Sequence, residues 1–464
     1  MRPPAGPELH SDYCNPEQVL DASVQALPAG VIVRVIQAYR YALDNTPADE
    51  RHFWSHAGAS RFAWNWGLAR CKERYEAEGK WYTAFDLGKL WNAEKKANPD
   101  LAWWSENSKW VYETAFRDLE RALKDFIKSK KGERKGRRLG FPRFKKRGKC
   151  RDSFRLCGGD RASCSGNTVK LPKLGTIRTH ESTRKLARRL ENGTARIVSA
   201  TVSRTAQRWF VSFTVEVERA VPERHARPGS AVGVDLGVKT LLTGVDDTGN
   251  VITVDGPKPL RASLRKLRRA SRAHSRKAKG SANRRKSAAR LARIHARVAN
   301  VRADALHKAT SPLAARHETV VAEDLNVVGL VRNRKMARAI LDQGLGEARR
   351  MLGYKTTWSG GRLIPAGRFY PSSKICSSCG AVKAKLALKD RVFVCEVPTC
   401  GLVIDRDVNA AVNLLKLAAS GADSNACGGY VRPGLAGQRP VKQEPGTALA
   451  GQTGTVVSQG TAAA

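Results

Sequence analysis

The chain has 464 residues, of which 83 are Lys or Arg and 42 are Asp or Glu, so its formal net charge is +41. This length exceeds one ordinary hydrophobic core and predicts two or three domains. A hydrophobic content of 41% excludes a chain that is disordered throughout. No apolar run approaches the roughly 18 residues that a membrane-spanning helix needs. A charge of +41 opposes compaction unless a polyanion neutralises it, so the composition predicts a nucleic-acid partner.

The N-terminus and the cysteines indicate the compartment. The first residues, Met-Arg-Pro-Pro, lack the apolar region of a signal peptide, so we expect a cytoplasmic protein. Ten cysteines in a long chain without an export signal favour thiols and metal ligands over a disulfide framework.

The first third of the chain divides into four segments. Residues 1–30 show no periodic pattern and are expected to form a flexible extension. Residues 31–46 alternate well enough to predict a strand, the first of a small β-barrel. Residues 47–127 have helical periodicity and hold eight of the ten tryptophans, which favours a Trp-rich helical core. Residues 128–160 are rich in Lys, Arg and Gly and are predicted to form a basic loop or linker.

The middle of the chain changes period twice. Residues 161–228 switch to a period of two, which predicts the rest of the β-barrel. A second sheet begins within 229–370, and residues 258–310 are an amphipathic helical pair that turns near Gly280. From Lys258 to Arg302 there are 17 Lys or Arg and no acid. Solvated helices usually interleave both signs of charge, so this run predicts phosphate binding that weakens steeply with salt.

Three acids stand in apolar surroundings, where an ionised carboxylate is costly unless a cation or hydrogen bonds compensate it. Asp235 lies in the apolar strand AVGVDLGVKT, Glu323 ends TVVAE, and Asp407 opens the helix in IDRDVNAAVNLL. If they converge, they can hold two Mg²⁺ ions that activate a water and stabilise the leaving oxygen of a phosphodiester. Each acid alone is more often a cap or an ion pair. The pattern does not separate Asp407 from Asp405, which can cap the same helix.

Four cysteines form two close pairs within residues 371–404. The spacing of two closely set pairs predicts one structural Zn²⁺ in a ribbon. Four thiolates fill the coordination of the ion, so no position is left for a substrate. Residues 405–418 are then predicted to be a helix, and residues 419–464, poor in apolar side chains, a disordered tail. The expected zinc ligands are Cys376, Cys379, Cys395 and Cys400.

Several motifs together resemble one family. They are GVDLGVKT, VVAEDLN, CSSCG followed by CG and DRDVNAAVNLL, with RFAWNWGLAR, GFPRFKK and YPSSKICSSCG. These segments resemble the TnpB family of transposon-encoded RNA-guided nucleases, from about residue 36 to residue 418. Two features depart from the family pattern. The second cysteine pair encloses four residues where the family usually has two, and the extension before Val31 is longer than usual.

The resemblance implies a multidomain α+β fold similar to that of compact type V CRISPR effectors. It comprises an RNase H-like (RuvC) nuclease domain with an inserted zinc ribbon, a small β-barrel (wedge) domain and a helical recognition domain. By residue-wise match, Asp235, Glu323 and Asp407 are the catalytic acids that bind Mg²⁺. Asp407 is preferred over Asp405 because relatives with one Asp in this motif keep the position two before Asn-Ala-Ala.

The resemblance also implies partners. A guide RNA from the right end of the transposon pairs with one strand of double-stranded DNA beside a short adjacent motif, and the RuvC site cuts both strands. We expect a monomer in the ribonucleoprotein, nucleoid-associated in a bacterium, with no membrane partner. The alternatives are a conventional transposase or resolvase acting on the ends of its element, an RNA-guided repressor that has lost nuclease activity, and a CRISPR effector with array-derived guides.

Overall fold

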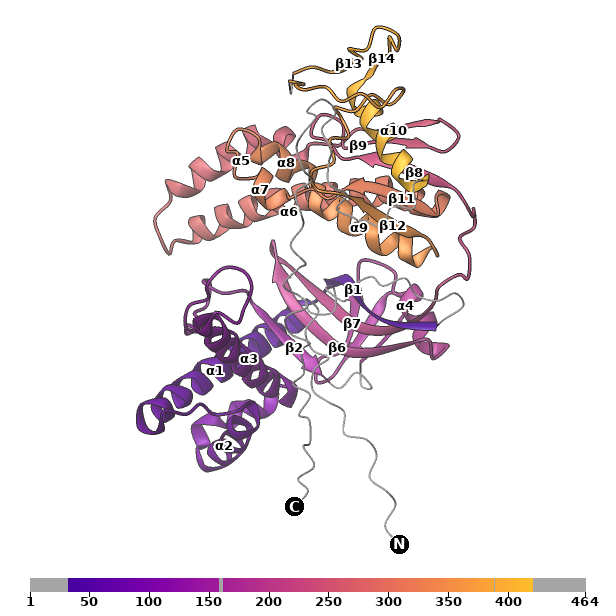
Figure 1. The fold of residues 1–464 in the computed structure, drawn as a ribbon. Coiled ribbons are helices and arrows are strands. Elements are labelled where there is room, and N and C mark those ends of the chain that lie inside the picture. Colours follow the sequence, from indigo (N-terminus) through magenta and orange to yellow (C-terminus); the bar gives the residue numbers. More distant parts are fainter. Residues whose placement is uncertain (1–31, 158–161, 388, 420–464) are drawn as a thin grey trace, which may run out of the picture.

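The computed structural model describes residues 32–157, 162–387 and 389–419. The predicted flexible extension and disordered tail therefore lie outside the described residues, except for Ala419. Figure 1 shows two lobes, one holding the N-terminal helices and a large sheet, the other a smaller sheet with its helices. The two-stranded cysteine ribbon projects from the second lobe at the end far from the first.

The N-terminal helices begin and end at strong local signals. Thr46 and Thr83 each form a capping box with the residue three positions on, which fixes the starts of the first two helices. Gly79, with φ of +68°, ends the first helix in the left-handed conformation that glycine adopts most easily. These helices pack on the large sheet through aromatic rings, as where Phe53 meets Trp209 at 5.2 Å between ring centroids. The elements are α1 (Pro47–Glu78), α2 (Ala84–Ala97), the 3₁₀ helix η2 (Pro99–Glu106) and α3 (Lys109–Lys131).

The large sheet has seven antiparallel strands in the order β2-β6-β7-β1-β5-β4-β3. The first strand belongs to both halves, because its residues 32–42 pair with β7 and residues 43–44 pair with β5. Among the described residues no pairing joins β2 to β3, so the strand order is open rather than a closed ring. The strands are β1 (Ile32–Asp44), β2 (Ser153–Cys157), β3 (Ser163–Ser165), β4 (Thr168–Leu171), β5 (Gly175–Thr179), β6 (Ala195–Thr205) and β7 (Arg208–Ala220), with α4 (Arg184–Glu191) between β5 and β6.

The smaller sheet has five strands in the order β10-β9-β8-β11-β12. Strand β9 is antiparallel to both β10 and β8, whereas β11 is parallel to both β8 and β12. The sequence predicts β8 and β11 but not β12, whose Arg and Pro interrupt an apolar pattern. The strands are β8 (Ala231–Asp235), β9 (Leu242–Asp246), β10 (Val251–Val254), β11 (Thr319–Glu323) and β12 (Arg362–Ala366).

Helices surround this sheet and extend from it. The predicted basic pair is confirmed as α5 (Pro259–Ser275) and α6 (Ala282–Arg316), with Gly280 between them at φ of +87°. The helices α7 (Val327–Leu330), α8 (Ala337–Gln343) and α9 (Leu345–Trp358) follow β11, and α10 (Arg406–Ala419) closes the described chain. The ribbon strands are β13 (Val392–Val394) and β14 (Val403–Asp405). None of the helices in the described ranges has the length and apolarity to cross a membrane.

Candidate functional site

Two of the predicted acids end neighbouring parallel strands. The register of β8 against β11 pairs Val234 with Ala322, so the next residues, Asp235 and Glu323, end these strands side by side. Carboxyl ends of parallel strands meet at the same edge of a sheet, where side chains from different strands can converge on one ligand. The topology therefore places these two carboxylates at one edge.

The third acid reaches this edge because α10 lies directly on β8. A Cβ atom added to Gly233 would stand 2.1 Å from the Ala411 carbonyl oxygen and 2.3 Å from the Leu415 amide nitrogen. Only glycine permits this close approach of helix to strand. Asp407 lies in the first turn of α10 and is thereby brought toward Asp235.

Asp405 and Asp407 have different surroundings. The Asp405 carboxylate accepts hydrogen bonds from the backbone N–H groups of Asp407, at 2.9 Å, and of Val408, at 3.2 Å. Asp405 is therefore the cap of α10, which is one of the two roles that the sequence left open for it. The carboxylate of Asp407 is not used in this cap, which leaves it available to the sheet edge.

The acids at this edge lack cationic partners. Burial raises the pKa of Asp235 to about 8, and the carboxylates of Glu323 and Asp407 act in the same direction, while Arg406 opposes them. Within the described residues, no ion pair shorter than 4.0 Å involves any of these three carboxylates. The next residue, Asp324, contrasts with them, because it pairs with both Arg349 and Arg368.

Oxygen donors at this edge suit a divalent cation, but among the described residues the three carboxylates do not lie close enough together to form a ready metal site. Carboxylate oxygens are the ligands that Mg²⁺ prefers, and a bound cation would relieve the repulsion that raises the pKa of Asp235. Asp235, Glu323 and Asp407 are the residues that would hold the ion. Their catalytic role remains a prediction.

The four predicted cysteines come together. Their sulfur atoms all lie within 4.8 Å of one another, the only such set of candidate metal ligands in the described part of the chain. The Sγ atoms of Cys376 and Cys400 are 3.6 Å apart, as are those of Cys379 and Cys395. A tetrahedral zinc with Zn–S bonds of about 2.3 Å separates its sulfurs by about 3.8 Å. The geometry and the donor set both fit a structural zinc.

Backbone amides support the thiolate form at this cluster. The amide of Val397 donates to the sulfur of Cys395 at 3.4 Å. The Leu402 backbone amide lowers the pKa of Cys400 to about 6, with a further contribution from Ser378. Thiolates rather than thiols bind metal, so these amides favour the ligating state. At Cys395 the Val397 amide lowers the pKa, but burial and the hydrogen bonds with the other three cysteines together raise it to about 12. The longer second knuckle, with four residues between its cysteines, still closes on the same point.

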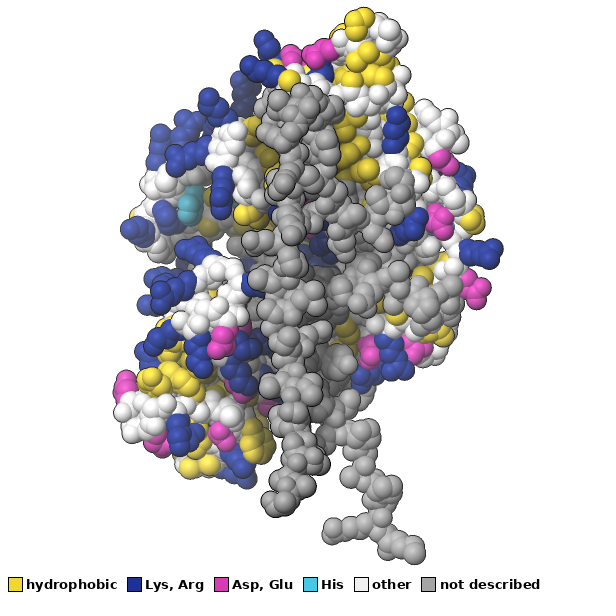
Figure 2. Space-filling model, viewed as in Figure 1, with side chains coloured by type: hydrophobic (Ala, Val, Ile, Leu, Met, Phe, Trp, Pro, Cys, Tyr) yellow, Lys and Arg dark blue, Asp and Glu magenta, His cyan; other side chains and the backbone are white. Residues whose placement is uncertain are grey.

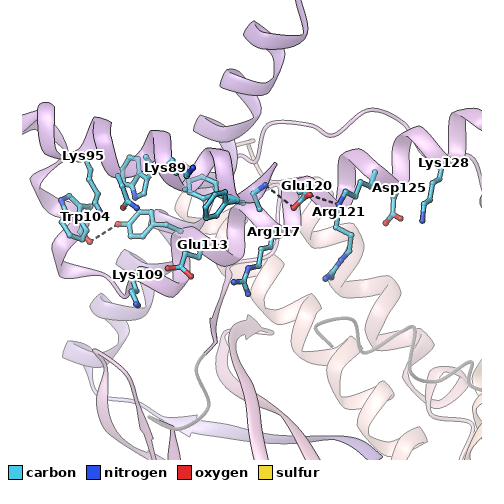
Figure 3. A pocket seen from close by; sticks show the side chains of 18 residues that line it. Lys89, Lys95, Trp104, Lys109, Glu113, Arg117, Glu120, Arg121, Asp125 and Lys128 are labelled. Atoms are coloured by element: carbon cyan, nitrogen blue, oxygen red, sulfur yellow. Dashed lines mark hydrogen bonds and ion pairs between the residues drawn. The ribbon is translucent and has the colours of Figure 1, made fainter. Parts of the chain in front are cut away.

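A basic groove of about 730 Å³ lies between α2 and α3. Figure 3 shows its cationic side chains on both helices, with Lys95 over the ring of Trp104 at 4.0 Å from the centroid. Positions 117, 121, 124 and 128 of α3 fall at helical spacing and are all Lys or Arg. The cations that line the groove are Lys89, Lys95, Lys109, Arg117, Arg121, Lys124 and Lys128, against the acids Glu113, Glu120 and Asp125.

A second basic surface lies on the arm formed by α5 and α6. Figure 2 shows Lys and Arg side chains gathered along this arm. A hollow of about 840 Å³ between the two helices is lined by four cations and no acid. The cations are Lys266, Arg290, Arg293 and Arg297. Unneutralised cations at this density suit a phosphate backbone.

Several residues that build the site were not predicted from the sequence. Gly233 sets the approach of α10, and Ser372 donates a hydrogen bond of 2.5 Å from its hydroxyl to Glu323. Asn409 and Asn413 are buried on α10 and bind the chain around the first cysteine pair. Glycine between two valines of a strand, and asparagines four apart on an apolar helix face, were the available signals.

Comparisons with known proteins place these features in a family. Fold and site define a mixed α+β multidomain protein with a four-cysteine cluster and basic surfaces. Residues 212–334 match the family described as "Probable transposase" (OrfB_IS605), and residues 346–414 match "Cas12f1-like, TNB domain". The chain is 36% identical over 440 residues to "Putative RNA-guided DNA endonuclease Rv2885c" of Mycobacterium tuberculosis, covering 89% of this chain and 94% of that protein.

A second relative agrees. "Putative RNA-guided DNA endonuclease InsQ" of Escherichia coli is 33% identical over 425 residues, covering 88% of this chain and 97% of that protein. The chain therefore belongs to the TnpB (OrfB_IS605) family, which confirms the resemblance seen in its motifs. A solved Cas12f1–sgRNA–target DNA complex matches 82% of this chain and 98% of its own, with 13% identity and a TM-score of 0.49.

The description of one matching family differs from what the structure shows. Residues 35–80 match "Helix-turn-helix domain". The structure instead has most of strand β1 and the single long helix α1 over these residues, with the first helix break at Gly79. This segment therefore does not present two helices joined by a turn.

Proposed function

We propose that the protein is an RNA-guided, Mg²⁺-dependent DNA endonuclease of an insertion sequence, with a RuvC-type, RNase H-like nuclease domain. It cleaves double-stranded DNA next to a short transposon-adjacent motif, using a guide RNA from the right end of the element. The observation that carries the proposal is the set of unpaired acids Asp235, Glu323 and Asp407 at one sheet edge. The two relatives, each named "Putative RNA-guided DNA endonuclease", support the same proposal.

The site residues have distinct tasks in this proposal. Asp235, Glu323 and Asp407 hold the cations, which activate the attacking water and stabilise the leaving oxygen when bound. Asp405 fixes the start of α10 and thereby the position of Asp407. The zinc ribbon is structural, because its four thiolates leave no position for substrate.

The basic surfaces supply binding that does not depend on sequence. Base pairing between guide and target would provide the specificity, so the protein needs mainly contacts to the phosphate backbone. The groove between α2 and α3 and the hollow between α5 and α6 offer such contacts. A single chain in each ribonucleoprotein is the simplest assembly.

The test begins with the RNA that the protein carries. The protein is purified from cells with its native locus, the bound RNA is sequenced, and a matching DNA is offered with and without Mg²⁺. One abundant RNA that ends beyond the right end of the element, with Mg²⁺-dependent cleavage of its match, is the expected result. RNA derived from an array would indicate a CRISPR effector instead. Binding to the element ends without RNA would favour the conventional transposase that the description "Probable transposase" suggests.

A further inference from the structure

The cysteine ribbon is physically tied to the acid edge through a serine that precedes it. The hydroxyl of Ser372 donates to the carboxylate of Glu323 at 2.5 Å, although the two residues are 49 positions apart. Ser372 is only 2% exposed, so water does not compete freely for this contact. Glu323 has no cationic partner among the described residues, so this hydroxyl is a fixed constraint on its carboxylate.

Ser372 is itself held by α10. Its carbonyl oxygen accepts a hydrogen bond of 2.8 Å from the side-chain amide of Asn413, which also donates to the carbonyl of Ile375 at 2.7 Å. Asn413 is 1% exposed. Because this buried amide donates to two backbone carbonyls, it fixes the backbone of residues 372–375 against the helix.

One turn earlier on the same helix face, Asn409 holds the first knuckle. Its side chain donates to the Ile375 carbonyl at 2.7 Å and accepts from the Ser377 amide at 3.0 Å. These contacts lie on both sides of Cys376, which is fully buried. The helix that begins with Asp407 is therefore attached to the ribbon through its first cysteine.

We propose that Ser372 is a positioning residue for Glu323, held by Asn413, and that the zinc ribbon thereby sets the geometry of the carboxylate site. This inference rests on the proposed function, because it assigns a purpose to the acids at that site. The same segment orients two acids: Glu323 through the serine hydroxyl, and Asp407 through the attachment of α10. Such supporting hydrogen bonds typically change metal affinity by about 10- to 100-fold when they are removed.

The test uses the purified ribonucleoprotein and Mn²⁺ as a spectroscopic probe, with binding followed by electron paramagnetic resonance. The RNA also binds Mn²⁺, so the specific signal is the part that an Asp235→Asn particle lacks. We expect Ser372→Ala to raise the Mn²⁺ concentration for half-saturation about tenfold. Zinc content and bound RNA should stay at wild-type levels. Ser372→Thr, which keeps the hydroxyl, should recover most of the affinity.

The neighbouring Ser373 provides the matched control, since its side chain makes no hydrogen bond within the described residues. Ser373→Ala should bind Mn²⁺ as the wild type does. Wild-type Mn²⁺ affinity in Ser372→Ala would overturn the proposal. So would loss of zinc together with Mn²⁺ in that variant, because Ser372 would then be a folding residue.

A substitution of Cys379, an exposed cysteine of the ribbon, tests the contribution of the ribbon. Cys379→Ser should lose zinc and weaken the specific Mn²⁺ signal in the same direction as Ser372→Ala. Unchanged Mn²⁺ affinity after zinc loss would overturn the role of the ribbon. A weakened signal in Ser372→Ala, in a particle whose wild type does not cleave DNA, would support positioning while the proposed function fails. A wild type without any Asp235-dependent signal would refute both.

Discussion

The acid edge of the smaller sheet and the basic arm of α5 and α6 are opposite in charge and alike in one respect. At the acid edge, Asp235, Glu323 and Asp407 have no ion pair within the described residues. On the arm, the segment from Lys258 to Arg302 has 17 cations and no acid. Asp324, the residue next to Glu323, instead pairs with two arginines. Since neither region contains ion pairs that neutralise it, the proposed function assigns a proton or a metal cation to the edge and a polyanion to the arm.

The largest effect is expected from removing one acid of the edge while leaving its neighbour. Asp407→Asn should lower DNA cleavage by about 10³-fold or more, because metal-bound charge stabilisation supplies several kcal/mol. Asp405→Asn should cleave within a few-fold of wild type, because Asn caps a helix as well as Asp. Single-turnover cleavage of a matched DNA by the two ribonucleoproteins measures this. Equal losses of cleavage in both variants would show that Asp405 and Asp407 do not have the different roles that the structure indicates.

Neutralising the arm should give the next largest change. Replacement of Lys266, Arg290, Arg293 and Arg297 by Gln should weaken nucleic-acid binding about 100-fold at low salt. The plot of log K against log salt should become shallower by about 3, because each lost phosphate contact removes about 0.7 to 0.9 of slope. Filter binding over a salt series gives both quantities.

A single-site comparison on one helix serves as the control for the arm. Arg297→Gln should lower the salt slope, whereas Lys308→Gln should not, because Lys308 is already paired with Asp304 at 2.8 Å. An unchanged salt slope in the variant with all four substitutions would mean that the arm faces solvent, and not phosphates, in the complex.

The packing that brings the edge together is expected to be sensitive to one methyl group. Gly233→Ala places a Cβ against the backbone of α10 at 2.1 Å, so the helix must move. We expect a loss of about 2 kcal/mol or more in the free energy of unfolding, with reduced cleavage. Gly244→Ala in the adjacent strand β9 is the control, because its nearest contact would be 3.4 Å. Chemical denaturation of both variants tests this, and equal stabilities would contradict the close approach.

The sequence was informative where the signal is local. Hydrophobic periodicity located the arm, and spacing located the cysteines, because both patterns lie within one element or one loop. The strand β12 was missed because Arg362 and Pro365 obscure its pattern, and its pairing with β11 decides its conformation.

The supporting residues could not be predicted for a different reason. Ser372 contacts Glu323, and Asn413 contacts Ser372, across 49 and 41 positions. The need for glycine at position 233 likewise exists only once α10 lies on the strand. The acids are visible in the sequence as unusual residues in two apolar strands and one apolar helix, but what orients them is decided by tertiary contact.

A pH dependence of stability is expected to separate the edge from the rest of the molecule. In Mg²⁺-free buffer the pKa of Asp235 in the folded chain is about 8, against 3.8 for its ordinary value. Below pH 4 the carboxyl is protonated in both states and has no effect on stability. Between pH 4 and pH 8 the unfolded chain releases this proton while the folded chain keeps it, so stability falls with rising pH by up to about 1.4 kcal/mol per pH unit. Above pH 8 the loss is complete.

Asp235→Asn removes the ionisable carboxyl, so the variant no longer binds or releases this proton. Relative to wild type, the variant should therefore gain stability progressively from pH 5 to pH 8 and no further above it, as followed by thermal unfolding without Mg²⁺. Added Mg²⁺ should abolish much of the difference, because the cation replaces the proton as the neutralising charge. A stability difference independent of pH would show that Asp235 is already ionised in the folded chain. Groups of the chain itself would then compensate the negative charge of the edge, whereas the positive charge of the arm has no such compensation.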